Sequence, residues 1–410
     1  MTAEDAHRAA LAWFRTNWDP RQPLRDWWQL LADSGWGFPT WPEAFFGKGL
    51  DAAGGKAVAR ARREVGAFGG PQGIATMMVA PTLMEVGTPA QQQRYLPALA
   101  NGTEIWCQLF SEPGAGSDLA GVQTRAVRDG DEWIVTGQKV WTSGGHYAKW
   151  AILVARTDSD VPKHAGLSFF LIDMDQPGVE VRPLRQMTGT AEFNEVFLTE
   201  ARVRHDDLVG ELGGGWGVAL RLLGHERDSL DADADVSGIQ GDLDLGAPAG
   251  SFVGGGANPG ADDGTGPFAL TQGQGAMDLV TELLADAGRN GDALARQWAA
   301  SVATQVRLAR YNAGSLPASA GKLAATKLLR EVRDLSLRLL GPGGTLTGPD
   351  AARAGLVADM ALLSPGLSIA GGTDEIQRNI IGERDLGLPP EPRVDKHVTF
   401  RELNQPGAHS

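Results

Sequence analysis

A glycine-rich loop carries residue types suited to holding a flat, electron-rich ligand. In SEPGAGSD, which begins at Ser111, Pro113 fixes one φ angle, and Gly114 and Gly116 permit a close approach to the backbone. Such a loop presents N–H groups together with the hydroxyls of Ser111 and Ser117. It is neither a Walker loop nor a Rossmann fingerprint, because no GKS or GKT follows and no GxGxxG opens a strand–helix–strand unit. Taken alone, the loop would be interpreted as a plain surface turn.

Two further stretches contribute compatible chemistry. In KVWTSGG, Trp141 could stack its indole on a flat ring, while Thr142 and Ser143 could hydrogen-bond to the ring edge. Ordinary core packing is the alternative for Trp141 when this motif is considered alone. Near the C-terminus, AGGTDEIQ joins two glycines to Thr373 and an amphipathic helix. The start of a helix offers N–H groups and a positive dipole end to a phosphate.

A carboxylate on an apolar helical stripe is the candidate for a general base. In WGVALRLLGHERDSL, Glu226 shares one helical face with Ala219, Leu222, Leu223 and Leu230. A carboxylate there is costly unless it is paired or functional, and burial would raise its pKa from about 4.3 towards neutrality. The alternative is a structural Glu paired with an Arg of another helix, such as one in KLLREVRDLSLR. The pattern alone leaves both interpretations open.

The composition excludes several other classes of function. With 37 basic and 50 acidic side chains the net charge is -13, which argues against a binder of nucleic acid or anionic membranes. No apolar run approaches the roughly 20 residues that span a bilayer, and no secretion signal is visible. A single cysteine, Cys107, and seven scattered histidines without HxxxH or HExxH pairs argue against a disulfide or a metal centre. We therefore expect a cytoplasmic protein without metal.

The periodicity predicts helices, then strands, then helices. Helical patterns run from Ala3 to about Asn101, with LRDWWQLLADSGW stopped by Gly35. About six short strands follow without a helix between them, typical of a small sandwich or barrel, and EWIVTGQKVWTS predicts a hairpin turning near Gly137. From Trp216 the helical period returns, with one long helix over residues 316–340.

Residues 231–265 interrupt the last helical region. They hold seven Asp, nine Gly and no Lys or Arg, so they carry about half of the net negative charge. This composition predicts an acidic, flexible insertion that buries little apolar surface. Asp231, Asp233 and Asp235 alternate as in a calcium loop, but Val236 stands where the EF-hand turn needs Gly, which disfavours calcium binding.

Together these motifs closely resemble the acyl-CoA dehydrogenase family. The stretches GTPAQQQRYLPALANGTEIWCQLFSEPGAGSDLAG, KVWTSGG and GGTDEIQRNIIGERDLGLP occur in its order and spacing. The resemblance covers nearly the whole chain apart from the insertion. It implies an α+β multidomain fold with a helical N-terminal domain, a middle β-barrel and a C-terminal four-helix bundle. The expected boundaries are 1–103, 104–213, 214–390 with the insertion 231–265, and a tail at 391–410.

The resemblance also implies non-covalently bound FAD and names its contacts. The segment from Gln108 to Ser117 would meet one side of the flavin, and Trp141 to Ser143 the other. Thr373 and Glu375 would meet the phosphate and ribose, and Gln297 would reach the cofactor of a neighbouring subunit. The full set of expected cofactor contacts is Gln108, Phe110, Ser111, Gly116, Ser117, Trp141, Thr142, Ser143, Gln297, Thr373 and Glu375.

The position of the base departs from the common family pattern. Many relatives place a catalytic Glu immediately before the Gly-Thr of the C-terminal motif, where this chain has Gly371, preceded by Ala370. A subset carries its base on an earlier helix, in an ER pair that matches Glu226 and Arg227. The resemblance therefore favours Glu226 as the base that takes the Cα proton while FAD accepts the Cβ hydride. Gly371 would bind the thioester oxygen through its N–H, and Arg227 and Ser117 would support substrate binding.

The small residues at 370 and 371 leave room for branched or bulky acyl groups, including ring-bearing ones. With the family resemblance, fatty acid or steroid side-chain metabolism is the expected setting. The resemblance further implies electron-transfer flavoprotein as the acceptor and an oligomer, either a homodimer or homotetramer or an α2β2 heterotetramer. Two alternatives stay open: a non-catalytic partner subunit of a heteromeric dehydrogenase, and an acyl-CoA oxidase or flavin monooxygenase on the same fold.

Overall fold

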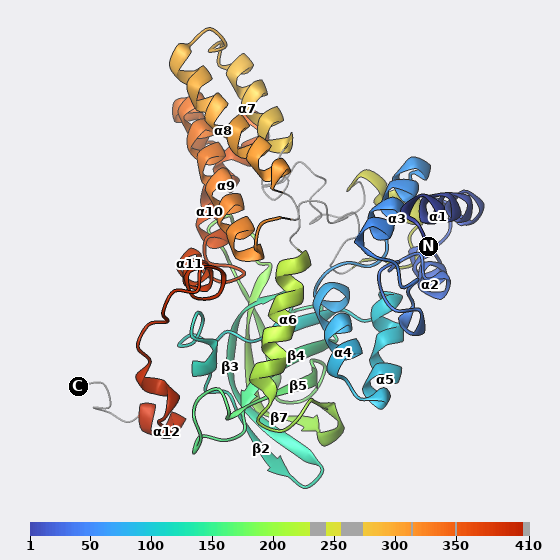
Figure 1. Ribbon diagram of the computed structural model, residues 1–410, viewed down its shortest axis with the longest axis vertical. Helices are drawn as coiled ribbons and strands as arrows, with labels where there is room; N and C mark the ends of the chain where they lie inside the picture. Colours follow the sequence, from blue (N-terminus) through green and yellow to red (C-terminus); the bar gives the residue numbers. More distant parts are fainter. Residues whose placement is uncertain (230–242, 256–273, 313–314, 349–350, 405–410) are drawn as a thin grey trace.

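The computed structural model describes residues 1–229, 243–255, 274–312, 315–348 and 351–404 (Figure 1). A β-sheet forms the middle of the molecule. One group of helices lies beside it near the N-terminus, and a second group projects away from it as a long bundle. The predicted succession of helices, strands and helices is confirmed.

The N-terminal region is helical, as predicted. The helix α2 ends where Gly35 adopts a left-handed conformation with φ of 73°. Trp27 and Trp28 of α2 are buried, and their indole N–H groups donate to the carbonyl oxygens of Phe68 and Gly69, both at 2.9 Å. The helices of this region are α1 (Ala3–Asn17), α2 (Leu24–Ser34), α3 (Ala52–Val65), α4 (Ala80–Val86) and α5 (Pro89–Ala100).

Part of the acidic insertion belongs to this N-terminal core. The N–H of Leu24 donates to the Ala247 carbonyl at 2.9 Å, and the N–H of Ala249 donates to Gln22 at 2.8 Å. Phe252 is buried with its ring 5.7 Å from that of Phe68. The prediction that the insertion buries little apolar surface is therefore wrong for residues 243–255. Its average composition concealed a short apolar anchor, LDLGAPAGSFVGG, while the Asp231–Asp235 stretch lies outside the described residues.

The middle region contains eight strands in one sheet, two more than predicted. The sheet order is β6-β7-β3-β2-β4-β5-β8, with β1 parallel to β4. The strands are β1 (Trp106–Leu109), β2 (Arg125–Asp129), β3 (Glu132–Ser143), β4 (Trp150–Arg156), β5 (Leu167–Asp173), β6 (Val179–Leu184), β7 (Phe193–Arg204) and β8 (Leu208–Val209).

The predicted hairpin near Gly137 is wrong. Residues 132–143 form one long strand, β3, which pairs with β7 and carries a register shift between Val135 and Gly137. The actual turn joins β2 to β3 at Gly130, whose φ is 62°. Gly137 serves close packing, because a Cβ there would lie 2.3 Å from the Thr124 hydroxyl oxygen.

The sheet curls so that its two faces bury different cores. Side chains of β5 and β7, which are far apart in the strand order, share one cluster that includes Phe170, Ile172 and Val196. The opposite face, with Ile152 and Phe169, packs against α4, α5 and α6. This second interface places α6 (Gly215–Ser229), the helix that carries Glu226, directly against the sheet.

Four of the C-terminal helices share a separate apolar core. They are α7 (Gln274–Asp286), α8 (Ala293–Tyr311), α9 (Ala318–Leu340) and α10 (Leu356–Leu367), and α9 confirms the long helix predicted over 316–340. The short helix α11 (Asp374–Ile380) packs on α9. No helix among the described residues is both long enough and apolar enough to cross a membrane.

The C-terminal segment returns to the middle region. The N–H of Phe400, at the start of α12 (Phe400–Leu403), donates to the Val161 carbonyl at 2.9 Å. The Arg156 guanidinium lies over the Phe400 ring, and Lys163 bridges Asp395 at 2.6 Å and Asp118 at 2.8 Å. This segment is therefore attached to the loop that follows β4.

Candidate active site

The loop after β1 is shaped by Glu112. Its carboxylate accepts the backbone N–H groups of Gln123 at 2.7 Å and Thr124 at 2.9 Å, which draws the chain into a tight bend. A Cβ added at Gly114 or Gly116 would meet nothing within 4 Å. Internal packing therefore does not require these glycines, and they leave open space beside an exposed backbone. Ser111 is half-buried, and Ser117 is exposed.

Lys139 joins this loop to β3. It is 0% exposed, and its ammonium donates to the Phe110 carbonyl at 2.9 Å, the Glu112 carboxylate at 2.9 Å and the Val154 carbonyl at 2.8 Å. Burial lowers the pKa of Lys139 to about 8, although the Glu112 charge opposes the shift. Sequence reasoning missed this pair. A signal was present, because Lys139 lies among residues of a strand that is otherwise apolar on its inward face.

Trp141 is held in an unusual conformation beside that loop. It lies at a β-bulge between Lys139 and Thr142, has φ of 63°, and is 61% exposed. Its indole contacts the edge of Phe193 at 5.9 Å between ring centroids. A non-glycine residue at positive φ costs about 1–3 kcal/mol and is found preferentially at ligand sites. The hydrogen bond from the Val140 N–H to the Ser111 carbonyl, at 2.9 Å, holds the two predicted segments side by side.

The neighbouring hydroxyl has no protein partner in the described part of the chain. Thr142 is fully buried, and its Oγ1 makes no hydrogen bond there, although its carbonyl accepts from Asn194 at 2.9 Å. A buried hydroxyl left unpaired costs about 1–3 kcal/mol, so it is expected to meet a ligand. An exposed indole beside an orphaned hydroxyl fits the face and edge of a flat ring such as a flavin.

The other residues predicted around this ring differ in their surroundings. Gln108, within β1, and Ser143, the last residue of β3, are half-buried. Phe110 is a core residue, with its ring 5.9 Å from that of Phe169. Gln297 is exposed on α8, in the projecting bundle, apart from this group.

A second group forms where α6 meets the turn before α11. Gly371 has φ of 64°, and a Cβ placed on it would lie 3.8 Å from Oε1 of Glu226. The structure therefore brings together two residues that the sequence separates by most of the C-terminal region. Glu226 is half-buried, on the same helix as the fully buried Ala219 and Leu222. The side chain of Arg227 lies outside the described residues.

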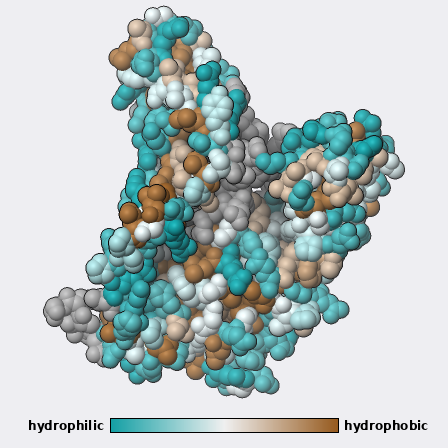
Figure 2. Space-filling view, in the orientation of Figure 1, coloured by the Kyte–Doolittle hydropathy of each residue, from teal (hydrophilic) through white to brown (hydrophobic). Residues whose placement is uncertain are grey.

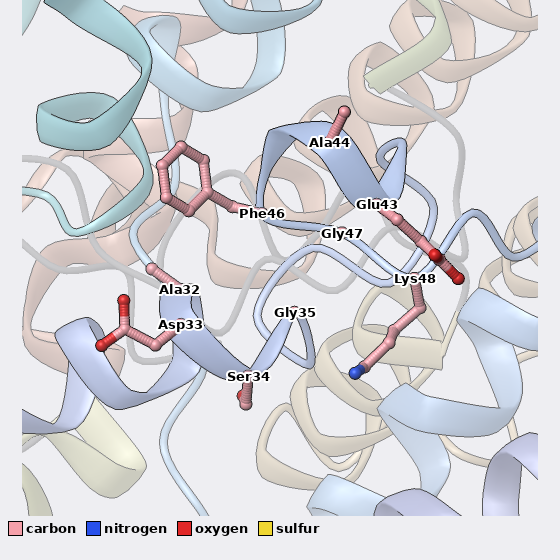
Figure 3. A pocket seen from close by; sticks show the side chains of 9 residues that line it. All are labelled: Ala32, Asp33, Ser34, Gly35, Glu43, Ala44, Phe46, Gly47 and Lys48. Carbon is pink, nitrogen blue, oxygen red and sulfur yellow. The ribbon is translucent and has the colours of Figure 1, made fainter. Parts of the chain in front are cut away.

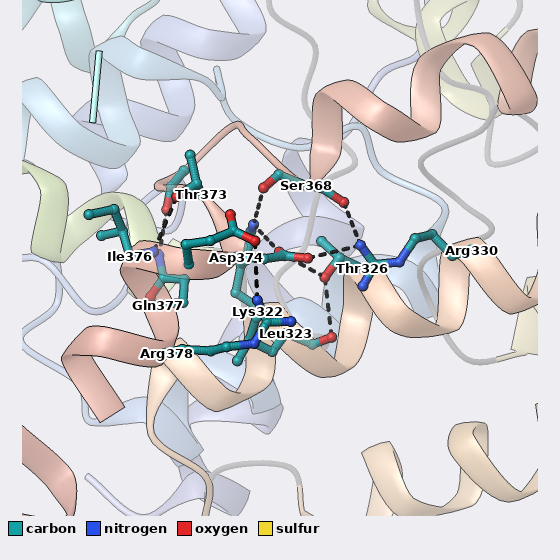
Figure 4. A network of polar contacts seen from close by, with 12 residues as sticks. Lys322, Leu323, Thr326, Arg330, Ser368, Thr373, Asp374, Ile376, Gln377 and Arg378 are labelled. Carbon is teal, nitrogen blue, oxygen red and sulfur yellow. Dashed lines mark hydrogen bonds and ion pairs between the residues drawn. The ribbon is translucent and has the colours of Figure 1, made fainter. Parts of the chain in front are cut away.

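The start of α11 supplies its own capping and a buried charge. The Thr373 hydroxyl accepts the Ile376 N–H at 3.1 Å, and Glu375 is exposed with Arg378 at 3.3 Å. Asp374 is 3% exposed and receives Lys322 at 2.7 Å and Arg330 at 2.9 Å (Figure 4). Burial works to raise the pKa of Asp374, but hydrogen bonds from these two cations outweigh it and lower the pKa.

Sequence reasoning also missed this ionic cluster. Lys322, Thr326 and Arg330 lie at i, i+4 and i+8 of the predicted long helix, so they share one face. Two cations aligned in that way on a half-buried face indicate an acidic partner elsewhere in the chain. No pattern in the sequence distinguishes Asp374 from its exposed neighbour Glu375 as that partner.

A surface hollow lies apart from both groups. It has a volume of about 490 Å³ and is lined by residues 32–35 at the end of α2 and by residues 43, 44 and 46–48, including Asp33, Glu43 and Lys48 (Figure 3). It shares no residue with the Trp141 group or with the Glu226–Gly371 pair. Within the described ranges, no cluster of three or more His, Cys, Asp or Glu side chains could hold a metal ion.

Comparison with known families identifies the three parts of the fold. The chain matches the N-terminal domain of acyl-CoA dehydrogenases over residues 2–103, the middle domain over 107–201 and the C-terminal domain over 272–386. The chain belongs to the acyl-CoA dehydrogenase family. The predicted three-part fold and enzyme class, an oxidoreductase, are confirmed. Members of this family bind FAD.

Relatives of this acyl-CoA dehydrogenase are similar over nearly its whole length. The acyl-CoA dehydrogenase IpdE1 of Mycobacterium tuberculosis is 37% identical over 90% of this chain and 89% of its own. The ChsE4–ChsE5 complex from M. tuberculosis has a TM-score of 0.63 at 29% identity, covering 94% of this chain and 97% of that one. A single-substitution variant of the Tcur3481–Tcur3483 steroid acyl-CoA dehydrogenase has a TM-score of 0.66 at 25% identity, covering 95% of this chain and 99% of that one.

Proposed function

We propose that this chain catalyses FAD-dependent α,β-dehydrogenation of an acyl-CoA thioester, with Glu226 as the general base. The observation that carries the proposal is the 3.8 Å between Glu226 Oε1 and the Cβ position of Gly371. A carboxylate carried by residue 371 would extend into the region that the Glu226 carboxylate occupies. Glu226 thus offers a carboxylate from α6 within side-chain reach of position 371, which supports its role as the base.

Gly371 contributes through its backbone. Its N–H makes no hydrogen bond within the described part of the chain, while its carbonyl accepts from Gln377 at 2.8 Å. An N–H beside the base can bind the thioester oxygen and stabilise the negative charge that develops as the Cα proton leaves. Comparable donors contribute about 3 kcal/mol to transition-state stabilisation.

The Trp141 group fits FAD. The exposed indole offers a face for stacking, Thr142 offers an unpaired hydroxyl at the ring edge, and the loop around Gly114 and Gly116 offers exposed backbone N–H groups. Ser117 and Thr373 lie on exposed or half-buried turns that can reach the rest of the cofactor. When bound, FAD supplies the acceptor for the Cβ hydride.

The substrate we propose is a bulky, ring-bearing acyl-CoA of the steroid type. Ala370 and Gly371 place almost no side-chain volume next to the base. Two similar structures are a steroid acyl-CoA dehydrogenase and the ChsE4–ChsE5 complex, and the name of each joins two different chains. These names support a steroid-type substrate and an α2β2 assembly with a second dehydrogenase chain.

Exposed apolar side chains on the projecting bundle support an assembly. Apolar residues are visible on its surface in Figure 2, and on α8 both Leu294 and Leu308 are about half exposed.

The proposed acceptor of the electrons is electron-transfer flavoprotein. A role as a non-catalytic partner subunit is the second candidate, because the chain lacks a carboxylate at position 371.

The test is flavin bleaching under anaerobic conditions with a panel of linear, branched and ring-bearing acyl-CoAs. We expect ring-bearing substrates to bleach the flavin of the wild-type chain, and Glu226→Gln to retain FAD but lose bleaching. Glu85→Gln is the matched control, since Glu85 is another carboxylate that contacts α6, through His225 at 3.3 Å. Bleaching in Glu226→Gln at the control rate would refute the assignment of the base. Peroxide production would indicate an oxidase, and bleaching that appears only with a partner chain carrying its own base would indicate the non-catalytic role.

A further inference from the structure

The turn that presents Gly371 to Glu226 is closed at its base. The N–H of Asp374 donates to the Ser368 carbonyl at 3.0 Å, which brings together the end of α10 and the start of α11. Gly371 and Gly372 lie between them with φ of 64° and 86°, a region that other residues enter only with strain. The turn has no side chain of its own at its apex to hold it in place.

Charges on α9 hold both ends of this turn. Lys322 donates to the Asp374 carboxylate at 2.7 Å and to the Ser368 carbonyl at 3.2 Å. Arg330 donates to the other Asp374 oxygen at 2.9 Å and to the Ser368 hydroxyl at 2.9 Å (Figure 4). Thr326 lies between them, 3.2 Å from Asp374. Each cation therefore contacts both the first and the last residue of the turn.

Gln377 holds the apex from inside. Its side chain is 1% exposed, and its Nε2 donates to the Gly371 carbonyl at 2.8 Å. A Cβ at Gly372 would lie 2.7 Å from that Nε2, so glycine at 372 is what lets the amide reach the turn. The peptide plane that carries the Gly371 carbonyl is thereby fixed. The Gly371 N–H lies in the preceding peptide plane, which joins this one at the Gly371 Cα, so the same hydrogen bond restrains its position.

We propose that Lys322, Arg330, Asp374 and Gln377 are positioning residues that set the Gly371 N–H against Glu226. The polar contacts described for the turn come from α9 and α11, whereas Glu226 stands on α6. The relative placement of base and oxyanion donor thus depends on an ionic clamp outside the reacting groups. A shift of about 1 Å in such a group costs up to about 100-fold in rate. The inference rests on the proposed function. None of these four residues is among the expected cofactor contacts.

The experiment compares Gln377→Leu with Arg378→Gln. The second variant is the matched control, because Arg378 lies on the same helix, is exposed and pairs only with Glu375 among the residues described. We measure kcat and KM with the fastest acyl-CoA of the panel, FAD content and melting temperature. We also measure deuterium exchange at Cα of a 3-thia-acyl-CoA, in which sulfur replaces Cβ and no hydride can leave.

For Gln377→Leu we expect kcat and Cα exchange at least about 10-fold below the control, with KM within about 3-fold and FAD content unchanged. A structural role alone would lower FAD content and melting temperature without this division between kcat and KM. Rates within about 2-fold of Arg378→Gln would overturn the proposal, even when the wild-type chain bleaches normally.

A milder variant keeps the test decisive if Gln377→Leu does not fold. Ser368→Ala removes only the hydroxyl that Arg330 contacts, and we expect about a 3-fold loss of kcat, with KM and FAD content retained. Arg330→Lys, which keeps the charge, should restore more activity than Arg330→Gln. Wild-type rates in Ser368→Ala together with equal rates in both Arg330 variants would contradict the clamp. Failure of the wild-type chain to bleach would instead contradict the proposed function itself.

Discussion

The buried pair between Lys139 and Glu112 should determine whether the loop and the Trp141 bulge stay together. In Lys139→Met the apolar length of the side chain is kept, but Glu112 loses a cation at 2.9 Å, and the Phe110 and Val154 carbonyls lose a donor. Removing one partner of a buried ion pair costs about 3–5 kcal/mol. Because Glu112 retains two backbone N–H bonds, we expect the lower end, about 3 kcal/mol in the free energy of unfolding.

The assay is urea denaturation followed by tryptophan fluorescence, with FAD content measured in parallel. Lys149→Met is the matched control, since Lys149 pairs with Asp173 at 3.0 Å but is about two-fifths exposed, and such pairs contribute at most about 1 kcal/mol. FAD content should fall in Lys139→Met and stay constant in Lys149→Met. Combining Lys139→Met with Glu112→Gln should recover part of the loss, because the unpaired charge is gone.

Two outcomes would contradict this reasoning. If Lys139→Met lost no more stability than Lys149→Met, the buried ammonium would not stabilise the sheet as its three hydrogen bonds indicate. If FAD content survived a loss of about 3 kcal/mol, the junction between Ser111 and Val140 would not depend on the ion pair.

Three further predictions concern pH, the cofactor and the insertion. Burial lowers the pKa of Lys139 from 10.5 to about 8. Between these pH values the folded chain binds fewer protons than the unfolded chain, so the contribution of Lys139 to stability rises with pH. The melting temperature of the wild type relative to Lys139→Met should therefore increase from about pH 8 to about pH 10. Thr142→Val should leave the apoprotein as stable as wild type and weaken FAD binding about 5-fold, one hydrogen bond of about 1 kcal/mol, measured by fluorescence titration. Phe252→Ala should destabilise the N-terminal helices by about 3–5 kcal/mol in urea denaturation, whereas the neighbouring, exposed Val253→Ala should change little.

The helices and the residue types of the candidate site could be read from the sequence because their signals are local. The helical spacing of the apolar residues and the end of the helix at Gly35 are sufficient to define α2. Glu226 stands out because its neighbours on the same helical face are apolar. The long helix α9 follows from the same period. These predictions needed no knowledge of which elements pack together.

The errors arose where one contact between distant segments overrides a local pattern. Gly137 resembles a turn residue, but its missing side chain admits Thr124, the residue just before β2. The acidic insertion resembles a flexible linker, but Phe252 buries its ring against Phe68. Asp374 was overlooked in favour of Glu375 because only the folded chain shows which of the two carboxylates meets Lys322.

The insertion bears on whether Glu226 can act as a base. An insertion that interrupts the helix soon after Glu226 would favour the non-catalytic alternative, since a frayed helix would not hold a carboxylate in place. In the structure α6 continues to Ser229, almost one turn past Glu226, and its earlier turns are buried against the sheet through Ala219 and Leu222. Residues 243–255 are in turn bound to the N-terminal helices. Glu226 thus stands on a supported helix, opposite a glycine that leaves it room, and this arrangement favours the catalytic role over the non-catalytic one.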